Sequence, residues 1–350
     1  MSEFVYDALP MRVVFGPGSL ARVVDEVDRQ SLRRVHVLST PPQRDLADRV
    51  ADLLGERCVG VFDRARMHVP AGTADAAGNM AAELRADGWV AVGGGSTIGL
   101  GKVLALRTGL PFVAVPTTYA GSEMTPIWGL TEAGRKQTGR DRAVLPRSVV
   151  YDPDLTLTLP VSASATSGLN AIAHAVEALY APDTSPVIAA MAERGVRDLA
   201  AALPMIAEHP GDGAARADCL RGAWLCGACL GATTMGLHHK LCHVLGGMLD
   251  LPHADTHAIV LPHVAAYNLP AAPAADAALR RALGADDAAA ALADLGARLG
   301  VPAGLRDLGV DRADLRRVAD EVWANPYANP RPVTRPELDG LLHAAWEGRA

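Results

Sequence analysis

Short apolar runs alternate with longer amphipathic stretches over the first 160 residues. Apolar runs of this length are typical of strands buried on both faces, and the intervening stretches have helical spacing. The predicted strands are 11–16, 35–39, 58–62, 89–92, 112–115 and 146–151. The predicted helices are 20–29, 43–55, 73–87 and 98–107. Strands that alternate with helices predict a doubly wound parallel sheet.

From Ser164 onward the pattern changes to alanine-rich helical stretches that follow one another to the end of the chain. The predicted helices are 164–180, 186–207, 213–232, 234–247, 254–268, 276–282, 286–300, 311–324 and 334–347. We therefore expect an α/β plus all-α protein: a Rossmann-like parallel sheet domain at 1–158, followed by an all-helical domain at 159–350. The cleft between the two is the expected place of an active site.

The amino-acid composition limits the classes of protein to which the chain could belong. Hydrophobic residues make up 49% but aromatics only 4%, which indicates helices packed through small side chains. The net charge of −6, with acids and bases interspersed, argues against nucleic acid or an anionic membrane as a partner. We expect a cytoplasmic protein, because no long apolar run or charged-then-apolar leader is present. The five cysteines, including the Cys226 and Cys229 pair, are expected to be reduced core thiols.

A glycine-rich loop is the first feature with chemical meaning. The strand 89–92 runs directly into Gly93, Gly94, Gly95, Ser96 and Thr97, and a helix follows. Glycines let a ligand approach the backbone, and the start of a helix offers N–H groups to phosphate. The loop matches neither GxGxxG nor a Walker A motif. Thr117, Thr118 and Ser122, after the next strand, add hydroxyls at the same sheet edge. Lys102 is expected to be a solvated helix residue.

The end of the second strand bears on the choice of cofactor. Dinucleotide folds often place an acidic residue there to hold the adenosine ribose. This chain has Ser39 and Thr40 instead, so no carboxylate would repel a 2′-phosphate. We expect Thr40 to lie near the ribose and the protein to discriminate weakly between NADH and NADPH.

A basic stretch follows the polar loop. Lys136 and Arg140 lie among further arginines between residues 135 and 142. Such a stretch is either an exposed basic loop or an anion-recognition site, and the sequence leaves both open.

Histidines are concentrated between residues 235 and 257. Five of the eleven histidines lie there: His238, His239, His243, His253 and His257. His239 and His243 share one face of the predicted helix. Histidine titrates near neutrality, so the cluster suits metal binding, proton transfer or anion binding.

Four motifs together carry a family resemblance: GGGSTIGLGK, PTTYAGSE, SGLNAIAHAVEALYA, and HHKLCHVLGG followed by LPHADTHA. The chain resembles the iron-containing (group III) alcohol dehydrogenase superfamily nearly end to end, and more closely its maleylacetate reductase branch. The resemblance implies a dehydroquinate synthase-like fold and a homodimer. It also implies reduction of the C=C bond of maleylacetate to 3-oxoadipate with NADH or NADPH, in the degradation of aromatic compounds.

The resemblance also implies a metal site, from which this chain departs. The superfamily holds a divalent metal with one aspartate and three histidines, at positions that match Asn170, His174, His239 and His253. Asn170 replaces the aspartate, and an amide brings only a dipole to the cation where a carboxylate brings a charge. We therefore expect a vestigial site and no requirement for a tightly bound metal.

Roles for the remaining polar residues follow from the expected reaction. His243 matches the position beside the nicotinamide and is the expected general acid or proton relay. His174, His239 and His253 are expected to line the site and polarise the substrate carbonyl. The candidates for contact with the small dicarboxylate substrate are His238, Lys240, Lys136, Arg140 and Asn170. His257 is either a supporting residue or a plain helix-face histidine, Glu177 is expected to cap or pair locally, and His263 is expected to be structural.

Three other functions compete with this one. A metal-dependent alcohol or polyol dehydrogenase of the same superfamily would need an aspartate at position 170. A lyase similar to dehydroquinate synthase would need more lysines and carboxylates around the site. A dicarboxylate-binding biosynthetic descendant without this activity is the third, and the chain's residues do not require it.

Overall fold

The structure is a computed structural model that describes residues 4–133 and 135–348. It divides into two compact units. One comprises Leu9–Leu159, and the other comprises Pro160–Ala350 together with Met1–Ala8. No helix among the described residues is both long and apolar enough to cross a membrane.

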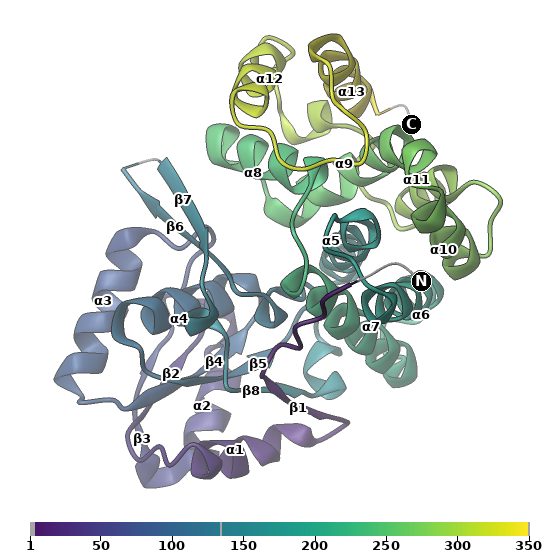
Figure 1. The fold of residues 1–350 in the computed structure, drawn as a ribbon. Helices are drawn as coiled ribbons and strands as arrows, with labels where there is room; N and C mark the ends of the chain where they lie inside the picture. Colours follow the sequence, from purple (N-terminus) through teal and green to yellow (C-terminus); the bar gives the residue numbers. More distant parts are fainter. Residues whose placement is uncertain (1–3, 134, 349–350) are drawn as a thin grey trace. The chain divides into compact units, whose positions relative to one another are not determined.

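The first unit is built on a six-stranded parallel sheet with the strand order β1-β8-β5-β4-β2-β3 (Figure 1). The strands are β1 (Arg12–Phe15), β2 (Val35–Leu38), β3 (Cys58–Phe62), β4 (Gly88–Gly93), β5 (Phe112–Pro116) and β8 (Ser148–Tyr151). Because β2, β4 and β5 are neighbours, the loops at their carboxyl ends meet at one edge of the sheet. The predicted parallel sheet is confirmed.

Helices cover both faces of this sheet. They are α1 (Val23–Arg29), α2 (Arg44–Leu54), α3 (Ala71–Glu83) and α4 (Gly95–Thr108). Valines of α1, α2 and the strands form one apolar core on the first face. On the opposite face α4 packs so closely that a Cβ at Gly101 would lie 3.3 Å from Ala91 and 3.4 Å from Phe112. The sheet is therefore buried on both sides, as its continuous apolar runs predict.

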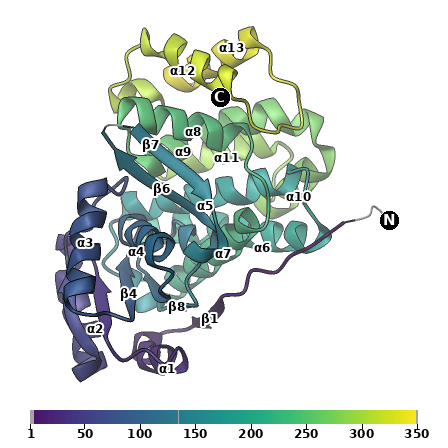
Figure 2. The same cartoon turned by 60° about the vertical axis from the view of Figure 1, so that its left-hand side comes forward.

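A β-hairpin includes most of the basic stretch that the sequence analysis describes as a loop. Strand β6 (Ile127–Glu132) pairs antiparallel with β7 (Arg135–Arg140), as Figure 2 shows. The prediction of a loop is wrong at this point, because the β7 sequence is polar throughout and shows no apolar alternation. A packing contact between the strands helps to hold the hairpin: a Cβ at Gly139 would lie 2.6 Å from the Trp128 ring.

The second unit is helical, as predicted, in the residues that the structure describes (Figure 1). Its helices are α5 (Val161–Tyr180), α6 (Pro186–Glu208), α7 (Gly213–Gly231), α8 (Leu237–Leu249), α9 (His253–Asn268), α10 (Pro273–Leu283), α11 (Ala288–Arg298), α12 (Asp314–Ala324) and α13 (Arg335–Glu347). Helix α10 begins before the predicted start at residue 276, because Pro273 suits the first turn of a helix.

Helix α5 lies at the centre of this unit, in contact with α6, α7 and α9. It is buried from Ser164 to Leu179. Small residues permit this packing, since a Cβ at Gly168 would lie 2.8 Å from Leu203. Cys226 and Cys229 are free and buried, which confirms that they are core thiols. A second apolar cluster joins α8, α9, α12 and α13.

Candidate active site

The glycines of the expected cofactor loop are needed for close contacts with neighbouring loops. Gly93 has φ +150°, and a Cβ there would lie 2.5 Å from Thr97 Oγ1 and 2.6 Å from Gln43 Oε1. A Cβ at Gly94 would lie 2.7 Å from Thr118 Cγ2. Gly95 is exposed, and nothing lies within 4 Å of its Cβ position. Gly93 and Gly94 therefore let the loops after β2, β4 and β5 pack closely against one another. Gly95 leaves open space at the start of α4.

The start of α4 suits an anionic ligand. Its N-cap, Gly94, offers no side chain, so no side-chain oxygen caps the first amides. Thr117 N donates to Gly93 O at 3.2 Å, and Gln43 Nε2 donates to Thr117 Oγ1 at 2.6 Å. Gln43 thus ties the loop after β2 to the loop after β5, and the sequence analysis missed it. Half-buried Thr40 precedes this segment.

Lys102 is not a solvated residue, so that expectation is wrong. Its side chain is buried, and Nζ donates to Ser122 O, Thr125 O, Thr125 Oγ1 and Ile127 O. Burial lowers the pKa of Lys102 to about 7. The ammonium group fixes the segment that carries Ser122 to the helix after the glycine loop, which positions both.

The basic hairpin has one described candidate for anion recognition. Arg140 is exposed at the end of β7. The side chain of Lys136 lies outside the described residues. A role for either residue in binding substrate stays a prediction.

Three helices of the second unit bring the predicted histidines together. His174 comes from α5, His238, His239 and His243 come from α8, and His253 and His257 come from α9. Ring centroids lie 5.3 Å apart for His174 and His239, 5.0 Å for His239 and His257, and 4.3 Å for His253 and His257. The rings of His243 and His253 are stacked at 6.4 Å. Histidines that are far apart in the sequence thus form one cluster, which we call the imidazole cluster.

Glu177 organises the start of α8. Its Oε1 accepts a hydrogen bond from His238 N at 2.7 Å, and its Oε2 accepts one from Gly236 N at 2.9 Å. Oε2 also lies 2.5 Å from His239 Nδ1. Gly236 is the N-cap of α8, so a buried carboxylate from α5 caps this helix from outside. The sequence analysis expected Glu177 to cap or pair locally. Glu177 does act as a cap, but on a helix that begins about 60 residues later in the chain.

The contact with Glu177 sets the proton position on His239. A carboxylate accepts hydrogen bonds, so Nδ1 of His239 carries the hydrogen and the neutral ring presents a lone pair at Nε2. That Nε2 is buried and has no hydrogen-bond partner among the described residues. Once protonated, the ring would form a buried ion pair with Glu177. His239 can therefore act as an oriented base, ligand or acid.

His238 and His257 form a neutral buried pair. His238 Nε2 lies 2.9 Å from His257 Nδ1, and both residues are fully buried. Burial first, and then the neighbouring histidines, lower the pKa of both rings well below the ordinary value. An uncharged ring that is already hydrogen-bonded is a poor ligand for a carboxylate. This geometry favours His238 and His257 as partners of each other over the predicted contact of His238 with substrate.

Lys240 lies on another face of α8. It is buried, and its Nζ lies 5.5 Å from the centroid of the Tyr327 ring. A pocket of about 320 Å³ adjoins this ring and is lined in part by Leu237, Trp323 and Arg331. Lys240 is thus the one predicted cation of the second unit beside a pocket large enough for a small acid.

Comparisons with known proteins show the family of the chain. The model of the Fe-containing alcohol dehydrogenase family, C-terminal, matches residues 164–346, and the model named iron-containing alcohol dehydrogenase matches residues 10–153. The chain belongs to the iron-containing alcohol dehydrogenase family. It is accordingly an oxidoreductase.

Within the iron-containing alcohol dehydrogenase family, the chain is similar to maleylacetate reductases over its full length. It is 54% identical to the maleylacetate reductase of Sphingobium indicum, with 99% of this chain and 98% of the relative covered. It is also 54% identical to that of Burkholderia cepacia, with 99% of each covered. The crystal structure of maleylacetate reductase from Agrobacterium tumefaciens matches with a TM-score of 0.95 and 51% identity, covering 100% of this chain and 99% of the other.

The family's name implies iron, at the positions of Asn170, His174, His239 and His253. The rings of His174 and His239 are close enough for a shared ligand, and Nε2 of His239 is available. Asn170, however, offers an amide dipole in place of a charge, and Glu177 is engaged by three N–H donors. This donor set does not fit a tightly held iron ion, so no reaction step is assigned to one.

Proposed function

We propose that this chain is an oxidoreductase that reduces the C=C double bond of maleylacetate with NADH or NADPH to give 3-oxoadipate. The observation that carries the proposal is identity of 51–54% to maleylacetate reductases over the full length of both chains. Asn170 supports it, because a metal-dependent alcohol dehydrogenase would need a carboxylate there.

The proposed reaction adds a hydride and a proton across a double bond conjugated to a ketone. A bound NADH or NADPH would supply the hydride for the carbon distant from the ketone, and the electron pair of the double bond would move toward the ketone oxygen as an enolate. A proton then adds to the carbon next to the ketone. The protein must hold the enolate charge and deliver that proton.

We assign these two tasks to four members of the imidazole cluster, namely His174, His239, His243 and His253. His243 is the proposed proton donor, and its ring stacks on that of His253. His239 has Glu177 behind it to stabilise an imidazolium, so it suits the stabilisation of negative charge on the substrate. His174 and His253 complete the lining. Asn170 offers an amide to the substrate.

The dinucleotide is proposed to lie at Gly93–Thr97, with its phosphates on the uncapped first turn of α4. Thr117, Thr118 and Ser122 are proposed to contact the nicotinamide end, and Thr40 the adenosine ribose. Use of both NADH and NADPH, a homodimer and a cytoplasmic location are part of the same proposal. Aromatic compound degradation is the proposed context, because 3-oxoadipate is the product.

Chelation tests the proposed independence from metal. NADH oxidation is measured with fresh maleylacetate before and after exhaustive treatment with a chelator. We expect the rate to be unchanged. A rate lost on chelation and restored by iron or zinc would overturn the proposed independence from metal. NADH oxidation that is absent in both states would overturn the proposed function.

The Lys240→Met variant tests whether Lys240 binds a carboxylate of the substrate. Methionine keeps an apolar stem beside Tyr327 and removes the charge, so KM for maleylacetate is expected to rise about tenfold or more. Arg298→Met, an exposed cation on α11, is the matched control and should leave KM unchanged. An unchanged KM in Lys240→Met would leave Arg140 as the described candidate for this contact, to be tested in the same way.

A further inference from the structure

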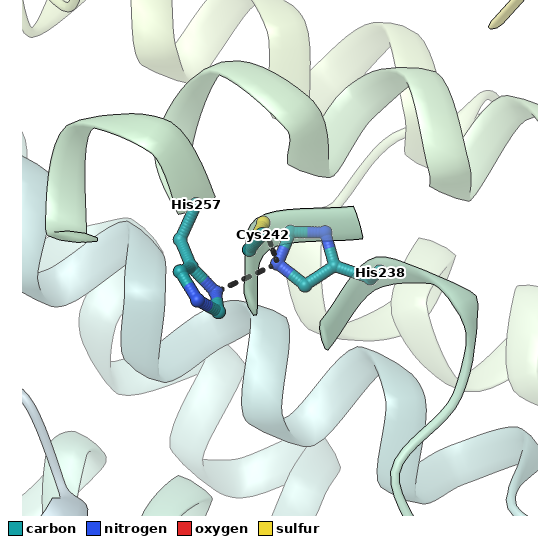
Figure 3. Close-up of side chains that lie close together, drawn as sticks. All are labelled: His238, Cys242 and His257. Carbon is teal, nitrogen blue, oxygen red and sulfur yellow. Dashed lines mark hydrogen bonds between the residues drawn. The ribbon is translucent and has the colours of Figure 1, made fainter. Parts of the chain in front are cut away.

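Three buried side chains of the second unit bring metal-binding atoms together without a role in the proposed reaction. They are His238 and Cys242 on α8, and His257 on α9 (Figure 3). Their donor atoms all lie within 4.8 Å of one another. His238 and Cys242 are four residues apart, so they project from one face of α8 toward His257. We call these three residues the His-Cys-His trio.

The spacing of the trio suits a tetrahedral ion. Zinc bonds of about 2.0 Å to nitrogen and 2.3 Å to sulfur place tetrahedral ligands about 3.3 Å apart for N···N and about 3.5 Å apart for N···S. Cys242 Sγ lies 3.7 Å from His238 Nε2, and His238 Nε2 lies 2.9 Å from His257 Nδ1. An ion would therefore need to separate the two nitrogens by about 0.4 Å. Cys242 and His257 lie within 4.8 Å of each other, so an ion would also draw these two side chains together.

The protonation chemistry also suits an ion. Burial raises the pKa of the Cys242 thiol well above its ordinary value, so without metal the sulfur is protonated and unreactive. A bound cation would displace that proton to solvent and hold the thiolate. In the pair His238 Nε2···His257 Nδ1 one ring donates to the other, so the accepting ring already has its hydrogen on its outer nitrogen. Binding an ion would require only the donating ring to move its hydrogen to its own outer nitrogen. The two outer nitrogens are His238 Nδ1 and His257 Nε2, and both are buried.

The charge balance of the surroundings is favourable. One thiolate leaves a divalent cation with a single positive charge. The carboxylate of Glu177 bonds the backbone of His238 and is itself buried, so it supplies a compensating charge nearby. His253, the neighbour of His257 at a ring distance of 4.3 Å, is half-buried.

We propose that His238, Cys242 and His257 form a binding site for a thiophilic cation such as zinc or cobalt. Its donor set of two imidazoles and one thiolate differs from the nitrogen and oxygen set at Asn170, His174, His239 and His253. Sulfur makes the site selective for softer ions over magnesium, calcium and manganese. The proposal is independent of the proposed reaction.

Cobalt(II) distinguishes the two donor sets, because only the His-Cys-His trio supplies sulfur. The full-length chain is treated with a chelator, cleared of it and titrated with cobalt(II). We expect a thiolate-to-cobalt charge-transfer absorption in the near ultraviolet that saturates at one equivalent. Cys242→Ser should abolish this absorption. Cys58→Ser removes a half-buried thiol of the other unit and should retain it, as should His174→Ala.

The proposal would be overturned if the unaltered chain lacked this absorption. It would also be overturned if the Cys242→Ser variant kept it. A second measurement does not depend on the folding of any variant. Zinc added to the unaltered chelated chain at pH 7 should release about one proton per ion bound, because one thiol is displaced. Zinc binding without proton release would also overturn the proposal.

Discussion

At the residue scale, the carboxylate of Glu177 makes contacts that its position in the sequence does not predict. Glu177 caps α8 through Gly236 and His238 and fixes the hydrogen of His239 on Nδ1. The sequence predicted each of the six clustered histidines of the site by position, but it did not predict which group would orient them. That information lies in how α5 packs against the start of α8, and periodicity alone does not encode such a contact.

Glu177→Gln is the sharpest test at the residue scale. All three partners of the carboxylate are N–H donors, so the amide nitrogen of glutamine would face a donor at either position. We expect the maximal rate of maleylacetate reduction to fall about 10- to 100-fold, as is typical when a group behind a functional histidine is lost. Steady-state kinetics measure the change.

Glu208→Gln is the matched control, because Glu208 is exposed at the end of α6. It should retain the full rate. A normal rate in Glu177→Gln would show that the orientation of His239 does not matter to catalysis.

At the scale of elements, sequence periodicity predicted the strands of the parallel sheet and the helices of the second unit. These elements are buried on faces that match their apolar spacing. The hairpin β6–β7 was not predicted, because its polar strands show no apolar periodicity. The burial of Lys102 was not predicted, because a lysine on a helix is usually solvated. In the structure its ammonium group is surrounded by carbonyl oxygens of the segment 122–127.

Lys102→Met is expected to destabilise the first unit by about 3 kcal/mol. The variant leaves buried carbonyl oxygens without a hydrogen-bond donor. The free-energy penalty for those unpaired oxygens exceeds the penalty for burying the lysine itself. Urea unfolding measures the difference. Arg107→Met, also on α4, removes an exposed ion pair with Asp75 and should change the free energy of unfolding by less than about 1 kcal/mol. Equal effects of the two variants would contradict the buried role of Lys102.

At the scale of the whole molecule, each unit buries a histidine that resists protonation. Burial lowers the pKa of His36 on β2 and of His263 on α9 to about 4. An unfolded histidine has a pKa of about 6.5. Between these two values the unfolded chain binds protons that the folded chain does not. Stability is therefore lost as the pH falls from about 6.5 toward 4.

His36→Leu tests this origin of acid sensitivity. Both ring nitrogens of His36 are buried without hydrogen-bond partners in the described part of the chain, so leucine removes no bond. Unfolding by urea at pH 7 and pH 5 is expected to show about 2 kcal/mol less acid destabilisation than in the unaltered chain. His209→Leu, at an exposed position, should behave like the unaltered chain. An undiminished pH effect in His36→Leu would assign the sensitivity to other groups.

The contacts around Gly93 and Gly94 have a consequence for directed evolution of cofactor preference. Gln43, Thr97 and Thr118 approach the Cβ positions of these glycines to within 3 Å. Changes at the glycines and at their neighbours are therefore not independent in their effect on fitness. A library that varies one position at a time will return mostly inactive clones there. Gly93, with φ +150°, will stay glycine, and productive variants will come from libraries in which residue 94 and residue 118 change together.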